Sequence, residues 1–115
     1  MRFADWPDVG AFALALPGTE TSTSYRQPAV KVGGRMFVST GHEEGSFHVR
    51  SPHEEKAILI ATDSATFWQT PHYENWPGLL VRYGSADPDR VALVIRRAWR
   101  DALKPGARKA HGERP

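Results

Sequence analysis

Capping signals and the spacing of apolar residues predict three helices. The first spans about residues 5–16, because Asp5 can cap it and the Leu-Pro-Gly run that follows cannot continue it. The second begins at the run Ser-Pro-His-Glu (51–54), where the serine can cap the helix and the glutamate can return the capping bond. The longest spans about residues 88–103, and an Asp-Pro pair opens it in the same way.

Alternating apolar and polar residues predict antiparallel strands between these helices. Val30 and Val32 share one strand face and lead into Gly33-Gly34, a pair that favours a tight hairpin turn. Further strands are expected over residues 35–40 and 47–49 and, after the second helix, over residues 67–70 and 79–83. Residues 19–24 fit either an edge strand or a loop.

The order helix, three to four strands, helix, two strands, helix indicates an α+β fold. We therefore expect a single compact domain with an antiparallel sheet of about five strands and helices packed against it. The domain is expected to span residues 1–105. The remaining residues, 106–115, form a basic tail poor in apolar residues that is predicted to be disordered.

Each helix has a predicted buried face. In the second helix the apolar stripe is formed by Ala57, Ile58, Ile60 and Ala61. At 100° per residue, the last helix places one apolar group toward the sheet: Val91, Val94, Ile95, Ala98, Trp99 and Ala102.

Basic residues are concentrated on the other side of the last helix and in the tail. The net charge is only +2, so their position matters more than their number. The candidate phosphate-binding cations here are Arg90, Arg96, Arg97, Arg100, Lys104, Arg108 and Lys109. The alternative is that they complement the helix dipole and keep the surface hydrated.

The sheet face that points away from the helices, here called the outer face, is a second candidate surface. Lys31, His48, Arg50 and Arg82 alternate with inward-pointing apolar residues, and Met36 or Phe37 lies beside them. Such a face can contact nucleic acid, form a homodimer or another protein interface, or simply be solvated, and the last is preferred.

The loop over residues 71–78 is the best candidate for a ligand pocket. His72, Tyr73 and Trp76 lie close together there and could line a small-molecule site. The alternative, which is preferred, is that these aromatic residues pin the loop onto the core.

Several classes of chemistry lack a sequence signal. The chain has no cysteine, which excludes disulfides and thiolate sites and is typical of a reducing cytoplasm. The histidines, including His42, His48 and His53, do not have the spacing of metal ligands. No nucleophile elbow, phosphate-binding glycine motif or long apolar run is present. We expect no catalytic residue, metal, cofactor or membrane span, and a cytoplasmic location.

Four stretches together resemble the MmcQ/YjbR-like family of small bacterial proteins. They are ALPGTETSTSYRQPAVKVGGRMFV (15–38), VRSPHEEKAILIATDSATFWQTPHY (49–73), WPGLLVRYG (76–84) and AWRDALKP (98–105). The resemblance implies a strongly curved antiparallel sheet with helices on one side. It also implies DNA binding, by analogy of the fold with double-wing DNA-binding proteins, and this analogy supplies no catalytic residues. The expected partner is double-stranded DNA, with a protein partner or a small ligand as the alternative.

Overall fold

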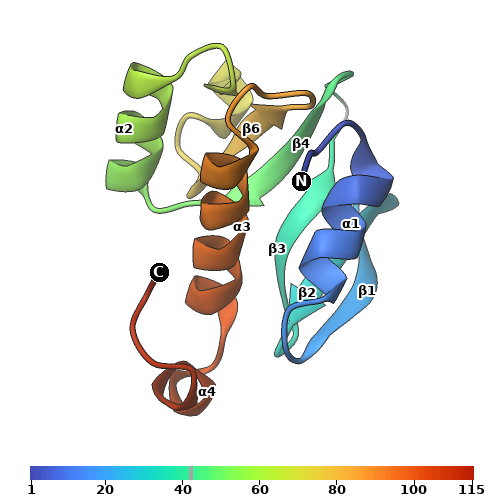
Figure 1. The fold of residues 1–115 in the computed structure, drawn as a ribbon, viewed down its shortest axis with the longest axis vertical. Helices are drawn as coiled ribbons and strands as arrows, with labels where there is room; N and C mark the ends of the chain where they lie inside the picture. The colour runs from blue at the N-terminus through green and yellow to red at the C-terminus, as the bar shows by residue number, and fades with distance from the viewer. Residues whose placement is uncertain (42) are drawn as a thin grey trace.

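The computed structural model describes residues 1–41 and 43–115. Helix α1 (Trp6–Leu14) precedes four strands, and helix α2 (His53–Thr62) precedes two more, which are separated by a short 3-10 turn, η1 (Pro71–Tyr73). Helices α3 (Pro88–Ala102) and α4 (Pro105–Ala110) complete the chain (Figure 1). The strands are β1 (Thr19–Ser24), β2 (Gln27–Val32), β3 (Arg35–Thr40), β4 (Ser46–Arg50), β5 (Phe67–Trp68) and β6 (Gly78–Arg82).

The six strands form one antiparallel sheet in the order β1-β2-β3-β4-β6-β5. The α+β class is therefore confirmed, with one strand more than the five expected. One core joins residues of α1, α2 and α3 to a single sheet face that includes Val30, Val49 and Val81. The helices thus cover one face, and the other remains available for a site.

Residues 19–24, which the sequence left open between strand and loop, form edge strand β1. Its partner β2 begins at Gln27, which pairs with Ser24 across a two-residue turn. The turn residues Tyr25 and Arg26 both have positive φ, 49° and 67°. Only glycine, asparagine and aspartate adopt this conformation readily, so the residue types Tyr and Arg do not indicate a hairpin here.

A β-bulge in β3 decides which of Met36 and Phe37 faces outward. Val30 pairs with Val38 and Lys31 pairs with Met36, so Phe37 is the extra residue of the bulge. Phe37 is fully buried in the core. Met36 therefore shares the outer face with Lys31.

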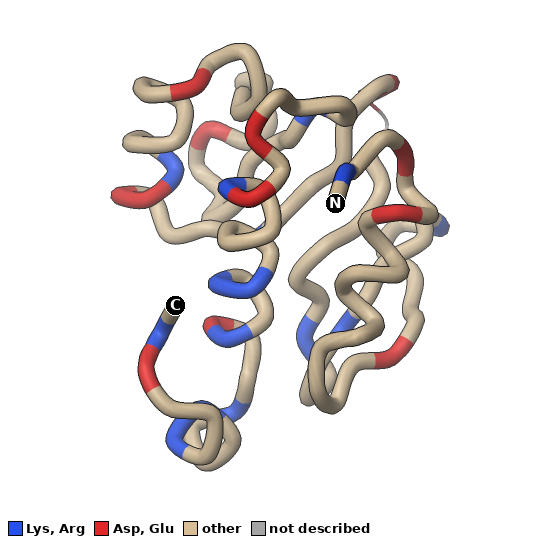
Figure 2. Tube along the Cα trace, in the orientation of Figure 1, with Lys and Arg blue, Asp and Glu red and all other residues tan. Residues whose placement is uncertain are grey.

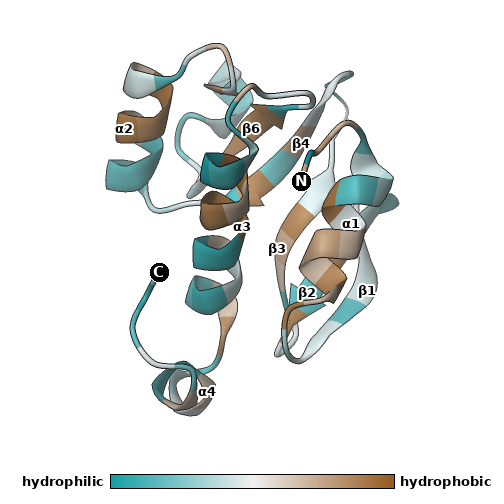
Figure 3. Cartoon of the chain, viewed as in Figure 1, coloured by the Kyte–Doolittle hydropathy of each residue, from teal (hydrophilic) through white to brown (hydrophobic). Residues whose placement is uncertain are grey.

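The predicted docking face of α3 is confirmed, since all six of its apolar residues are buried. Figure 3 shows the hydrophilic and hydrophobic residues that alternate along this helix. The predicted stripe of α2 is wrong at three of its four residues: Ile60 packs partly buried against the core, but Ala57, Ile58 and Ala61 are exposed. Lys56 and Leu59 are its buried residues, whereas the Ile58 side chain is 60% exposed.

The predicted capping box of α2 is also replaced by a different contact. Pro52 occupies the N-cap and the helix begins at His53, so Ser51 lies one residue outside it. The Ser51 hydroxyl instead donates to Oε2 of Glu55 at 2.8 Å. This bond fixes the carboxylate of Glu55 at the start of the helix.

The structure differs from the disordered tail that composition predicts. Residues 105–110 form α4, and the segment beyond it turns back along α3 (Figure 1). Arg114 forms an ion pair with Asp101 on α3 and another with Glu55 on α2. These ion pairs hold a segment that is poor in apolar residues against the helices. Composition alone does not predict such specific pairs. Among the helices described, none combines the length and the apolar character needed to cross a membrane.

Candidate ligand-binding site

Residues 71–77, here called the aromatic loop, are held in place by a single buried lysine. Lys56 is only 4% exposed. Its ammonium group donates to the carbonyl oxygens of Tyr73 at 2.8 Å, Glu74 at 3.2 Å and Trp76 at 2.8 Å. Burial lowers the pKa of Lys56, while the nearby Glu74 opposes that shift. Three acceptors compensate for the removal of the ammonium group from water, so the loop has a defined position.

The aromatic loop and the outer sheet face enclose a cavity of about 410 Å³. The structure brings the predicted residues His72, Tyr73 and Trp76 together at this cavity. The sheet and its turns contribute the other lining residues, which are Ser24, Tyr25, Gln27, Met36, Ser39, Thr40, Gly41 and His48. Cavities of this size are typical of small-molecule sites.

His48 lies between the sheet and the aromatic loop. Its ring stacks on Tyr73 with centroids 5.1 Å apart, and its Nε2 atom is buried without a hydrogen-bond partner. A Cβ atom on Gly78 would approach Nε2 to within 2.4 Å, so a glycine is required beneath this ring. Burial, together with the charge of Lys56, lowers the pKa of His48 to about 4. The imidazole is therefore neutral near pH 7.

The described cavity lining contains no aspartate, glutamate, lysine or arginine. Its polar groups are hydroxyls, the amide of Gln27 and the imidazoles of His48 and His72, and the Thr40 hydroxyl donates to Oε1 of Gln27 at 3.0 Å. Burial raises the pKa of Tyr73, and the charge of Glu43 adds to this effect. The phenol group therefore also stays uncharged. This chemistry suits an uncharged ligand better than a phosphate or a carboxylate.

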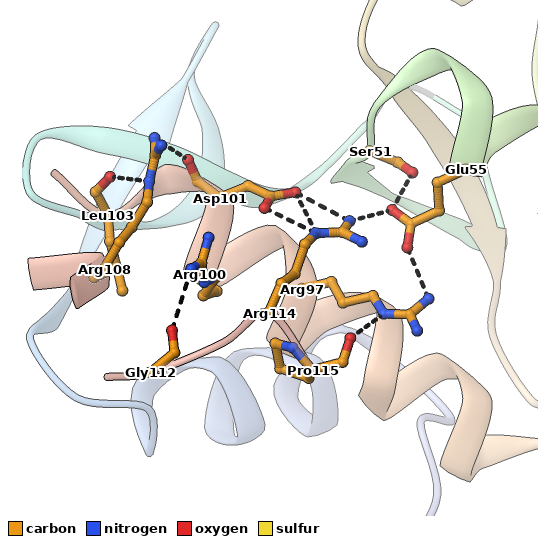
Figure 4. A network of polar contacts seen from close by, with 10 residues as sticks. All are labelled: Ser51, Glu55, Arg97, Arg100, Asp101, Leu103, Arg108, Gly112, Arg114 and Pro115. Atoms are coloured by element: carbon orange, nitrogen blue, oxygen red, sulfur yellow. Dashed lines mark hydrogen bonds and ion pairs between the residues drawn. The ribbon is translucent and has the colours of Figure 1, made fainter. Parts of the chain in front are cut away.

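The structure places most of the predicted α3 cations against partners within the protein. Arg97 donates to the Pro115 carbonyl oxygen at 2.7 Å, and its guanidinium pairs with Glu55 at 2.9 Å. Arg100 donates to the Gly112 carbonyl oxygen at 3.1 Å (Figure 4). Figure 2 shows acidic residues interspersed among these basic ones along α3 and the last segment. The basic face is thus largely an internal contact surface.

Glu55 is the centre of this network. Burial by itself raises its pKa, but hydrogen bonds from Ser51, Arg114 and Arg97 outweigh that effect and lower the pKa. The side chain of Arg108 bonds to a different group of atoms: it donates to the backbone oxygens of Leu103 and Asp101 (Figure 4). The carboxylate of Glu55 is therefore ionised at neutral pH and links α2 to α3.

The remaining candidate cations are dispersed. Arg90 donates to the Thr62 hydroxyl, and Arg96 lies over the ring of Phe12 with its guanidinium carbon 5.5 Å from the centroid. On the sheet, Lys31 pairs with Glu20 at 3.7 Å, and Arg82 lies over the Trp68 ring at 4.7 Å. Three candidate cations form no side-chain hydrogen bond or ion pair with other described residues. They are Arg50, Lys104 and Lys109.

Metal binding has no support in the part of the chain that the structure describes. No group of three histidine, aspartate or glutamate side chains within residues 1–41 and 43–115 could hold an ion together. His42, one of the histidines considered from the sequence, lies outside the described residues.

Sequence reasoning missed several residues that shape the cavity, among them Lys56, Tyr25, Gln27 and Ser39. Lys56 occupies a helix position where a lysine normally faces solvent, and nothing in its spacing marks it as buried. Tyr25 was assigned only to an interruption between strands. The run Ser-Tyr-Arg-Gln could have indicated its role only if the two-residue turn had been recognised first.

Comparison with known proteins agrees with this architecture. The model of the YjbR family matches residues 14–101. The crystal structure of Deinococcus radiodurans protein DR2400, with family-model domain DUF419, superimposes with a TM-score of 0.76 at 15% identity and covers 95% of this chain and 88% of that one. At that identity the likeness shows the fold alone. No curated protein matches the chain. The family match spans most of the sequence and confirms the resemblance seen in its motifs, and the chain belongs to the YjbR family.

Proposed function

We propose that this protein is a binding module without catalytic activity and that its ligand is a small uncharged organic molecule held in the outer-face cavity. The observation that carries the proposal is the enclosure of about 410 Å³ between the sheet and the aromatic loop. Lys56 fixes that loop through three carbonyl oxygens, so the cavity does not depend on a ligand for its shape. A preformed, mostly apolar cavity with a few polar groups is the usual form of a ligand site.

The test is a ligand-observed NMR screen of uncharged fragments against the whole chain. Trp76 lines the cavity and is 52% exposed, so Trp76→Ala removes a wall of the site without opening the core. Ile58→Ala is the matched control, because Ile58 is 60% exposed and lies on α2 outside the cavity lining. We expect fragment binding that Trp76→Ala abolishes and Ile58→Ala preserves. If no fragment binding depends on Trp76, the cavity is not a ligand site.

DNA binding is a second candidate, and one specific contact favours it. A Cβ atom on Gly33 would lie 3.5 Å from the Lys104 side chain, so the end of α3 and the β2–β3 turn meet. That turn lies between Lys31 and Arg35. Lys104, Arg35 and Lys109 on α4, here called the helix–hairpin corner, offer phosphates more accessible charge than the paired arginines of α3. Lys31 flanks the same turn but pairs with Glu20.

This second candidate is tested by the salt dependence of duplex binding. We expect the affinity for a random-sequence duplex to fall steeply between about 50 and 200 mM salt, because phosphate contacts release counterions. Lys104→Ala/Lys109→Ala should weaken binding and reduce the slope. Arg2→Ala/Arg26→Ala removes the same charge away from the corner and serves as the control. Absence of binding at low salt, or an equal loss in both variants, would contradict a role for the corner.

A further inference from the structure

We propose that the outer-face cavity recognises a nucleobase, that is, a neutral, planar heteroaromatic ring with hydrogen-bonding edges. This inference rests on the proposed binding function of the cavity and specifies the chemical class of its ligand. Four features of the cavity lead to this class: its aromatic walls, its polar floor, the absence of acidic, lysine and arginine side chains from its described lining, and the strained turn at its mouth.

The walls of the cavity are formed largely by flat rings. His48 and Tyr73 stack with an interplanar angle of 30°, and the rings of His72 and Trp76 are also nearly parallel, at 25°. His72 meets Tyr73 edge to face at 84°. Flat rings in several orientations offer both stacking and edge contacts to a planar ligand. Such stacking is how proteins commonly hold unstacked bases.

The floor of the cavity is polar, which distinguishes it from a site for a hydrocarbon. Ser39 on β3 and Gln27 on β2 both line it. The Thr40 hydroxyl donates a hydrogen bond to the amide oxygen of Gln27. The amide NH₂ group of Gln27 then remains as a donor for a ligand. A purely apolar ligand would remove these groups from water without replacing their hydrogen bonds. A heterocycle with ring nitrogens or carbonyl groups would satisfy them.

The charge of the cavity favours a neutral ring. No aspartate, glutamate, lysine or arginine belongs to the described lining, and His48 is neutral near pH 7. A charged ligand would lose its hydration there without gaining a counter-ion. Nucleobases are uncharged at neutral pH and carry their polarity at the ring edge, so they meet this requirement.

The mouth of the cavity is formed by a strained turn. Tyr25 lines the cavity and is 84% exposed, and both it and Arg26 hold positive φ values of 49° and 67°. Such conformations are strained for residues that carry an ordinary side chain. Asparagine and glycine would form the same turn without this strain. The strain is explained if the tyrosine ring is needed at the mouth, where it can cover one face of a bound ring.

Isothermal titration of the whole chain with adenosine, cytidine, indole and methyl glucoside tests the inference. Adenosine and cytidine carry the hydrogen-bonding edge, indole supplies a ring with a single donor, and the glucoside supplies hydroxyls without an aromatic ring. We expect adenosine or cytidine to bind more tightly than indole by about tenfold or more, because the site would otherwise leave its polar groups unpaired. Methyl glucoside should not bind.

Two variants connect binding to the cavity. Gln27→Met/Ser39→Ala removes the polar floor and should lower nucleoside affinity about tenfold while leaving indole affinity within about twofold. Tyr25→Ala removes an exposed ring and keeps the core intact, so it remains informative if the first variant folds poorly. It should also weaken nucleoside binding. A single-stranded oligodeoxyadenylate distinguishes a free nucleoside from a base within a strand, because only strand binding weakens steeply with salt.

Each outcome separates this inference from the proposed function. If indole binds through Trp76 but neither nucleoside does, the cavity is a ligand site and the nucleobase inference is wrong. If none of the aromatic probes binds, the nucleobase inference is wrong, and the fragment screen with Trp76→Ala decides the proposed function separately. Nucleoside binding that is unaffected by both variants would place the nucleoside elsewhere on the protein and would also overturn the inference.

Discussion

At the scale of single residues, Lys56 has the largest influence on the cavity. Lys56→Met keeps the length of the side chain but removes its bonds to three carbonyl oxygens. We expect the variant to lose about 1–3 kcal/mol of unfolding free energy, because the loop loses three hydrogen bonds from a charged donor. The Tyr73 and Trp76 oxygens each keep one backbone N–H donor, from Trp76 and Gly78. Urea denaturation measures that loss, and hydrogen exchange should show faster opening of residues 71–77. Lys109→Met, an exposed lysine on α4, is the control and should change neither quantity.

The histidine beneath the same loop makes stability depend on pH. The pKa of His48 is about 4 in the folded protein against an ordinary value of 6.5, because burial and Lys56 disfavour its charged form. The unfolded chain therefore binds a proton that the folded chain does not. Stability rises with pH between about 4 and 6.5 and is lost as pH falls through that window, by at most about 3 kcal/mol.

Unfolding free energies measured from pH 7 to pH 4 test this dependence. His48→Asn should remove most of the slope between pH 6.5 and 5, where Glu55 remains ionised because its pKa is lowered. His53→Asn, an exposed histidine at the start of α2, should keep the slope of the original protein. Equal slopes in all three proteins would show that His48 is not the group responsible.

At the scale of elements, the β1–β2 turn is strained because it carries tyrosine and arginine at positions with positive φ. Tyr25→Asn/Arg26→Gly introduces the pair that two-residue turns with positive φ prefer. We expect the unfolding free energy to rise by about 1–2 kcal/mol as the strain is removed. Thermal or urea denaturation measures this gain. Arg26→Gly alone, which keeps Tyr25, should give part of the gain and retain ligand binding.

The elements also show where sequence reasoning succeeds and where it fails. The α3 face was predictable, because its buried residues follow the helical period strictly from Val91 to Ala102. The α2 face was not, because a lysine replaces an apolar residue at its centre and three carbonyl oxygens from a distant loop satisfy it. His72, Tyr73 and Trp76 were identified from composition. Alternation also placed His48 on the outer face, but its position beside Ser39 depends on strand register, which local patterns do not fix.

At the scale of the whole molecule, the last segment connects elements that are distant in sequence. Glu55 on α2 receives Arg97 from α3 and Arg114 from the last segment, and Asp101 pairs with Arg114 as well (Figure 4). These side chains are partly buried, so the pairs are screened less than surface ion pairs. The basic residues that resembled a DNA-binding surface in the sequence therefore contribute to the cohesion of the helical layer.

The contribution of this network can be measured with a double-mutant cycle. Arg114→Ala should lower the unfolding free energy by about 1–2 kcal/mol, because it removes two ion pairs and leaves Glu55 with one arginine. Glu55→Gln should cost a similar amount. The double variant should lose less than the sum, by about 0.5 kcal/mol or more, since both changes remove the same contact. Limited proteolysis should cut residues 105–115 faster in Arg114→Ala than in Lys109→Ala. Additive losses with unchanged proteolysis would show that the segment stays in place without Arg114, and the cohesion would then come from the packing of α4 alone.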